Sequence, residues 1–308
     1  MTGNDDTLLK QLDTLISEGR NPATMAIDEG TSLEIVRSIN DEDHKVAPAI
    51  ARIAPQIAEA VDLIVASLNR GGRLFYVGAG TSGRLGILDA VECRPTFSVP
   101  DSLVVGIIAG GEPAVMHAVE GAEDNSDAGC SDLKAYNINA SDIVVGLSAS
   151  GRTPYVTGAL TCAREHGCAT VGVACTPDSP VLQAADVALC PVVGPEALTG
   201  STRMKSGTAQ KMILNILSTA AMIRLGKTYQ NLMVDVNASN QKLKARAIRI
   251  VMQATDCDAA TARTALNDSA QQTKVAILMI LTGMDAKAAR QSLTHHNGFL
   301  RRAAETSS

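Results

Sequence analysis

The sequence predicts an α/β protein built on a doubly wound parallel sheet, flanked by N-terminal helices and a small C-terminal helical bundle. Short, continuous β-branched runs alternate with helical patterns through the middle of the chain, which is typical of strands buried on both faces. The segments on either side show helical spacing only. We therefore divide the 308 residues into an N-terminal helical segment (1–60), a central sheet domain (61–230) and a C-terminal helical domain (231–308).

The first clear element is a helix over residues 46–68, which ends before Gly71 and Gly72. Its apolar residues recur at helical spacing, so they are expected to form one buried face. These residues are Ile50, Ile53, Ile57, Val61 and Ile64. Five strands follow, at residues 73–77, 103–108, 142–146, 170–174 and 186–190.

From about Ala247 the chain shows short helical patterns and no good strand. The segment 256–258 and Asp285 can each cap a helix, and Asn297-Gly298 predicts a turn. These signals predict a small helical bundle.

The composition excludes nucleic acid as a partner. Three Phe and four Tyr are the only aromatic residues, too few for the stacking platforms that bind single strands. The formal net charge is −5, without the basic excess that phosphate-backbone binding requires.

No membrane partner or exported form is expected either. No apolar run reaches the roughly 18 to 20 residues of a membrane span, and the N-terminus lacks the features of a signal peptide. The sequence therefore favours a cytoplasmic protein. Its 7 cysteines are odd in number and lack CxxC spacing, so we expect reduced core residues and no metal site.

The most informative loop, residues 78–84, follows the first strand directly and opens a helix. It could be a tight turn with a Ser/Thr cap, or a dinucleotide fingerprint, since Gly78, Gly80 and Gly83 have GxGxxG spacing. The second strand, however, ends in glycines where a ribose-binding carboxylate would be expected. Hydroxyls and free N–H groups at a helix N-terminus suit a phosphate monoester.

Two further loops carry hydroxyl groups. Residues 146–154 follow the third strand, and Pro154 is placed to enter the next helix. Residues 196–211 add hydroxyls and the cations Arg203 and Lys205 ahead of a long apolar helix. Loops after parallel strands converge on one crevice, so the set favours an anion site.

In this order the three loops resemble those of the sugar isomerase (SIS) superfamily of phosphosugar-binding domains. Four longer strings, residues 78–94, 109–125, 146–157 and 199–212, resemble the N-acetylmuramic acid 6-phosphate etherase family more specifically. The resemblance extends over nearly the whole chain, through residues 231–243 and the helical tail.

The resemblance implies that D-lactate is eliminated from N-acetylmuramic acid 6-phosphate and that water is then added, with no cofactor and no metal. The family's motifs imply that Glu92 is the acid that assists lactate departure and later helps to activate water, with Glu123 as its acid/base partner. The positions of the loops within the superfamily imply a set of substrate-binding residues. They are Thr81, Ser82, Gly83, Ser148, Ser150, Thr153, Thr202, Arg203 and Lys205.

One position departs from the family pattern. Where the family usually has Ser-Glu-Cys-Pro-Pro, this chain has Val-Glu-Cys-Arg-Pro over residues 91–95. An Arg94 side chain close to Glu92 would lower the pKa of that carboxyl and weaken it as an acid near neutral pH.

Two other functions share these loops: an aldose-ketose isomerase, and a phosphosugar sensor resembling glucokinase regulatory protein. Retention of both glutamates in their matching strings favours the etherase. The superfamily also implies a homodimer, with sites near the subunit interface and a small sugar phosphate as the partner.

Overall fold

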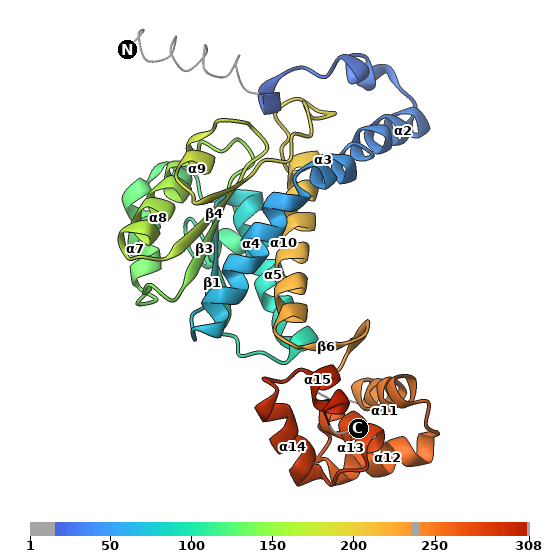
Figure 1. The fold of residues 1–308 in the computed structure, drawn as a ribbon. Helices are drawn as coiled ribbons and strands as arrows, with labels where there is room; N and C mark the ends of the chain where they lie inside the picture. Colours follow the sequence, from blue (N-terminus) through green and yellow to red (C-terminus); the bar gives the residue numbers. More distant parts are fainter. Residues whose placement is uncertain (1–15, 236–240, 307–308) are drawn as a thin grey trace. The chain divides into compact units, whose positions relative to one another are not determined.

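The computed structural model describes residues 16–235 and 241–306, which fall into two compact units (Figure 1). Within the described residues, the first unit contains the chain up to Ala90 together with Ser102–Leu217. The second contains Val91–Asp101 together with the chain from Ser218 onward. The finer three-part division expected from the sequence stays a prediction.

The first unit is built around a five-stranded parallel sheet in the order β2-β1-β3-β4-β5. The predicted doubly wound parallel sheet is therefore confirmed, and each predicted strand is present to within one or two residues. The strands are β1 (Leu74–Gly78), β2 (Val104–Ile108), β3 (Ile143–Leu147), β4 (Ala169–Val173) and β5 (Val187–Leu189).

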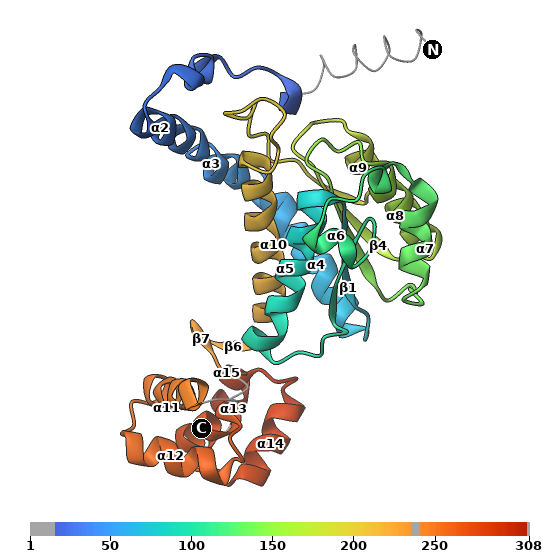
Figure 2. The ribbon, with the colours of Figure 1, turned by 180° about the vertical axis from the view of Figure 1, so that it is seen from behind.

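Helices cover both faces of this sheet (Figures 1 and 2). One face carries α7 (Ser126–Lys134), α8 (Pro154–Glu165) and α9 (Pro180–Gln183), and the other carries α4 (Ala54–Asn69), α5 (Gly80–Phe97) and α10 (Lys205–Arg224). Successive side chains of β1 point to opposite faces of the sheet and are buried on both faces. Phe75 and Val77 pack with the α7–α8 layer, whereas the Tyr76 hydroxyl donates to Asp89 Oδ2 on α5 at 3.0 Å.

The single helix predicted over residues 46–68 is wrong in one respect, because the structure divides it. Helix α3 (Val46–Arg52) ends before Ile53, whose φ and ψ of −107° and 15° lie outside the helical region, and α4 begins at Ala54. Pro55 explains the break, since a proline inside a continuous helix would remove a hydrogen bond and clash with the carbonyl four residues earlier. The predicted face is otherwise buried, including Ile57 and Ile64.

Six further helices belong to the described part of the first unit. They are η1 (Ile16–Glu18), η2 (Pro22–Thr24), η3 (Ile27–Glu29), α2 (Ser32–Asp43), α6 (Pro113–Met116) and η4 (Ala122–Asp124).

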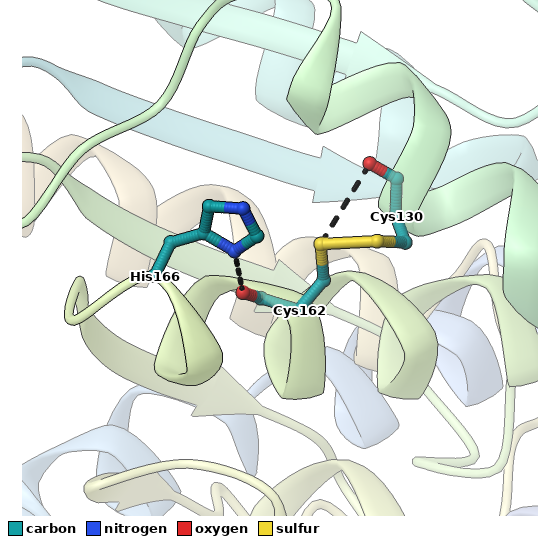
Figure 3. The surroundings of a disulfide bond; sticks show 3 residues. All are labelled: Cys130, Cys162 and His166. Carbon is teal, nitrogen blue, oxygen red and sulfur yellow. Dashed lines mark hydrogen bonds between the residues drawn. A yellow bond between two sulfur atoms is a disulfide. The ribbon is translucent and has the colours of Figure 1, made fainter.

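Helices α7 and α8 pack closely because glycines lie between them. A Cβ on Gly129 would come within 2.0 Å of the Tyr155 carbonyl oxygen, and one on Gly158 within 2.1 Å of the Ser126 carbonyl oxygen. A disulfide also joins Cys130 of α7 to Cys162 of α8 (Figure 3). The prediction that every cysteine is reduced is therefore wrong for this pair.

Reducing this disulfide is expected to lower the free energy of unfolding by about 3 kcal/mol, because the unfolded chain regains the freedom of a long loop. The two cysteines are 32 residues apart in the sequence. Urea unfolding with and without a thiol reductant measures the difference. A Cys130→Ser/Cys162→Ser double variant should not respond to the reductant, and equal midpoints for oxidised and reduced wild type would contradict the prediction.

The second unit is a helical bundle, as the sequence predicts. It contains α11 (Gln241–Thr255), α12 (Ala259–Asp268), α13 (Thr273–Thr282), α14 (Ala286–His295) and α15 (Leu300–Glu305). Asp258 and Asp285 cap α12 and α14, each accepting from a backbone N–H at 2.8 Å. A short hairpin of β6 (Thr228–Tyr229) and β7 (Leu232–Met233) precedes the bundle and was not predicted.

Among the residues that the structure describes, no helix is both long enough and apolar enough to cross a membrane.

Candidate active site

The first two predicted loops lie side by side at the carboxyl edge of the sheet. One follows β1 and the other follows β3, and these strands are neighbours paired in parallel register. Such an edge is where open α/β sheets bind their ligands. The fold therefore brings the loops together as the sequence predicts.

The third loop reaches the first through the N-terminal part of α10. The Ser82 hydroxyl donates to Gln210 Oε1 on α10 at 2.8 Å, and both side chains are buried. A Cβ on Gly207 would lie 3.6 Å from the Thr81 side chain. The side chains of Thr81 and Ser82 thus face α10 directly, Ser82 through its hydroxyl. Gln210 was not among the predicted site residues, although it lies within the string that carries the family resemblance.

The second loop is held in shape by its own hydroxyl groups. Ser148 Oγ lies 2.8 Å from Thr153 Oγ1 and accepts a hydrogen bond from the Gly151 N–H at 3.0 Å. Gly151 has a φ of +72°, and a Cβ there would lie 2.1 Å from Ser179 Oγ, so this position needs glycine. Ser150 and Thr153 remain half-buried and therefore accessible to a small ligand.

Buried polar atoms without a partner gather around these loops. Within the described residues they include Ser179 Oγ, Thr176 Oγ1 and Gln210 Nε2. Ser179 adjoins Gly151 of the second loop, and Gln210 bonds Ser82 of the first. Because an unsatisfied buried polar group costs free energy, such a group next to a loop crevice indicates a ligand or water partner.

The third loop divides into an accessible part and a buried part. Arg203 is exposed and Thr202 is half-buried, whereas Lys205 is only 1% exposed and its ammonium bonds the Glu42 carboxylate of α2. Burial raises the pKa of Glu42, but hydrogen bonds from Lys205, Lys45 and Asn21 outweigh it and lower that pKa to about 2. The Lys205 charge is therefore already neutralised within the protein.

Glu123 lies beside the first loop. Together with Gly80, Arg84 and Glu120 it lines a hollow of about 180 Å³. Arg84 holds one wall of this hollow, because its side chain donates to the carbonyl oxygens of Val115 and His117 at 2.9 and 3.2 Å. Glu123 is exposed, so its carboxylate is open to a ligand that enters the hollow.

Glu92 lies farther along α5. It is exposed, and it follows Ser82 by ten residues in the sequence of that helix. Arg94 forms its ion pair with Asp101, and both side chains are largely exposed. The guanidinium that the sequence suggested as a perturbing charge for Glu92 is therefore bound by another carboxylate.

The described residues contain no cluster of three His, Cys, Asp or Glu side chains that could hold a metal ion. The polar groups of the crevice are hydroxyls, amides and backbone N–H groups. This donor set suits an oxyanion such as phosphate.

Comparison with known proteins agrees with this site. Residues 56–164 match the N-terminal SIS domain of glucokinase regulatory protein, residues 126–220 match the SIS domain, and residues 230–276 match the C-terminal lid domain of glucokinase regulatory protein. A phosphoheptose isomerase structure from Francisella tularensis is 19% identical with a TM-score of 0.49, covering 63% of this chain and 100% of its own. The two SIS-domain matches and the parallel sheet define an SIS-domain protein.

Full-length relatives give the particular family. The N-acetylmuramic acid 6-phosphate etherase of Pseudoalteromonas atlantica is 61% identical over 96% of this chain and 96% of its own length. The etherase of Pectobacterium atrosepticum is 60% identical over 95% of this chain and 96% of its own. This chain belongs to the N-acetylmuramic acid 6-phosphate etherase family.

Proposed function

We propose that this protein cleaves the D-lactyl ether of N-acetylmuramic acid 6-phosphate, giving N-acetylglucosamine 6-phosphate and D-lactate, in peptidoglycan recycling and amino-sugar catabolism. The protein is then a carbon–oxygen lyase. The 61% identity to an etherase over 96% of both chains is the observation that supports this best. The hollow that joins Glu123 to the glycine loop of an SIS domain agrees with it.

The phosphate group anchors the substrate in this proposal. Hydroxyls and N–H groups of the first two loops donate to its oxygens, chiefly from Ser148, Ser150 and Thr153. Ser82 joins them when its hydroxyl turns from Gln210 Oε1 to the phosphate. The partner-free Gln210 Nε2 supports a further contact that the sequence did not suggest. Gly83 and Thr81 line the pocket, while Thr202 and Arg203 are available for sugar hydroxyls or charge.

The chemistry proceeds by elimination followed by hydration. Glu123 removes the proton from C2, which lies next to the aldehyde of the opened sugar, and the C2–C3 double bond forms as the C3–O bond breaks. Glu92 protonates the departing lactate oxygen. The Glu92 carboxylate then takes a proton from water as it adds at C3, and C2 regains a proton, so each carboxyl returns to its starting state.

A homodimer with sites near the subunit interface is part of the proposal. Glu92 and Ser82 belong to different compact units, because the division of the chain falls after Ala90 within α5. In the proposed dimer the partner subunit supplies Glu92, because symmetric dimers can place the same helix opposite a neighbouring site. The protein is further proposed to act in the cytoplasm, without nucleic-acid or membrane partners.

A phosphosugar sensor is the second candidate, favoured by matches to two domains of glucokinase regulatory protein. An aldose-ketose isomerase is the third. Incubating purified protein with N-acetylmuramic acid 6-phosphate and assaying D-lactate tests all three. Catalytic release of D-lactate supports the etherase, whereas tight binding without release would support the sensor and overturn the proposal.

Ser150→Ala is expected to raise KM for N-acetylmuramic acid 6-phosphate about tenfold while leaving kcat nearly unchanged, because a phosphate contact is made equally in the ground and transition states. Ser150 is half-buried, and its Oγ accepts a long 3.3 Å hydrogen bond from the Arg152 N–H, so the fold should survive its loss. Steady-state kinetics measures the effect. Ser131→Ala, an exposed serine of the same unit, is the control. An unchanged KM for Ser150→Ala would remove Ser150 from the phosphate site.

A further inference from the structure

The helical bundle of the second unit contains a cavity that the proposed reaction does not use. Its volume is about 680 Å³. The loop before α13, the first turn of α13 and one side of α14 line it, together with residues next to the β6–β7 hairpin. A cavity of this size suits a small-molecule ligand.

Positive charge dominates the lining of this cavity. Lys227, Lys274 and Arg290 face a single carboxylate, Asp235. Lys274 Nζ lies 2.9 Å and Lys227 Nζ 3.3 Å from the same oxygen of Asp235. Burial lowers the pKa of Lys274, and Asp235 opposes that shift. The lining carries three cations and one anion, so a second anion would be attracted to it.

Arg290 belongs to α14, and its side chain reaches the segment just before α13. Its Nε donates to Gln272 Oε1 at 2.8 Å and its Nη2 to the Ser269 carbonyl oxygen at 2.9 Å. These two bonds orient the guanidinium, and within the described chain they leave Nη1 without a partner. A fixed guanidinium with a free N–H is well suited to binding an oxyanion.

Thr273 provides independent evidence for a ligand. It is the first residue of α13, lines the cavity and is 2% exposed, yet its hydroxyl has no hydrogen-bond partner among the described residues. No side chain caps the N-terminus of this ten-residue helix. The positive end of the helix dipole, a spare hydroxyl and an oriented guanidinium thus meet at the same cavity.

We propose that this cavity is a second anion site, which binds a small ligand through a phosphate group. The phosphate oxygens accept from the Thr273 hydroxyl, from Arg290 Nη1 and from the lysine ammonium groups. The ligand is either free phosphate or a phosphorylated sugar, whose sugar portion the remaining volume accommodates. The site belongs to the helical unit and does not depend on the function proposed for the SIS domain.

The test is NMR of the full-length protein with labelled valine and leucine methyl groups, titrated with inorganic phosphate and separately with glucose 6-phosphate. Methyl groups of Val234, Val275 and Leu293 line the cavity and report on it directly. Saturable changes in the chemical shifts of these methyl groups support the site. The ligand that binds more tightly shows whether the site takes free phosphate or a phosphorylated sugar. If neither ligand shifts them saturably, the proposal is overturned.

Two variants make the test specific. Thr273→Val should weaken phosphate binding about tenfold without lowering the free energy of unfolding in phosphate-free buffer, because a buried hydroxyl without a partner is replaced by a methyl of the same shape. Lys287→Met, an exposed lysine on α14 outside the cavity, should bind as wild type does. Wild-type affinity in Thr273→Val would contradict the proposal.

A third variant separates this site from the SIS-domain site. In Ser148→Ala the cavity methyls should still shift with unchanged affinity. If those shifts disappear with Ser148→Ala, they report binding in the first unit and the second site does not exist. The result does not depend on whether the protein releases D-lactate.

Discussion

Glu123→Gln is expected to lower kcat for D-lactate release by about 10³-fold, and Glu92→Gln by a similar factor, because an amide can neither accept nor deliver the proton that each carboxyl transfers. Both side chains are exposed, so neither substitution should disturb the core. Initial rates with N-acetylmuramic acid 6-phosphate measure kcat. Calorimetric titration with the same sugar phosphate should show that both variants still bind it.

The control is Asp124→Asn, which removes an exposed carboxylate next to Glu123 on the same short helix. It should retain nearly full turnover. Near-normal turnover in Glu123→Gln or Glu92→Gln would exclude that glutamate from the proton transfers. Loss of binding together with turnover would instead indicate a role in substrate recognition.

Mixing the two inactive variants tests the shared site. If Glu92 comes from the partner subunit, a dimer of one Glu92→Gln and one Glu123→Gln subunit contains one intact site. Random exchange of subunits should then restore about a quarter of wild-type activity, since half of the dimers are mixed. Mixtures that stay inactive after subunit exchange would show that each site draws both glutamates from one chain.

The sheet and its loops were predictable because adjacent residues in the sequence carry the signal for a buried parallel strand. Each is a short apolar run followed by glycine or hydroxyl residues, as in Val77-Gly78 and Leu147-Ser148. The break at Ile53 was missed because apolar spacing continues through it, although Pro55 carried the signal. The local sequence pattern therefore predicted where helices and strands lie better than it predicted breaks within them.

Contacts between distant segments were not predictable in the same way. Cys130 and Cys162 are 32 residues apart, and only the packing of α7 on α8 makes them partners. The partner of Lys205 could not be predicted from the local sequence either. Its position among loop hydroxyls suggested a ligand contact, whereas its partner Glu42 is 163 residues away in the sequence. Nothing near either residue indicates the pair.

Lys205→Met is expected to lower the free energy of unfolding by about 3 to 5 kcal/mol, because it leaves the Glu42 carboxylate buried without its main cation. The two side chains are 1% and 3% exposed. Urea unfolding at neutral pH measures the loss. Lys211→Met, an exposed lysine on the same helix, should change the stability little, and the Glu42→Gln/Lys205→Met double variant should recover part of it.

The pH dependence of stability separates loss of the ion pair from loss of packing. The folded-state pKa of Glu42 is lowered to about 2, so its contribution is complete above the unfolded-state pKa near 4.5 and is lost as the pH falls from there toward 2. Wild type should lose on the order of 3 kcal/mol from this group over that range. Lys205→Met should lose distinctly less.

Kinetics then distinguishes the two roles open to Lys205. The Lys205 and Ser206 N–H groups both donate to the buried Glu196 carboxylate at 2.9 Å, which fixes the start of α10 and with it Gln210 opposite Ser82. If the role of Lys205 is structural, a Lys205→Met protein kept folded at low temperature should retain a KM near that of wild type. Methionine keeps the backbone N–H that donates to Glu196. A rise in KM of tenfold or more at full folding would make Lys205 a direct phosphate contact, which requires Glu42 to release it when substrate binds.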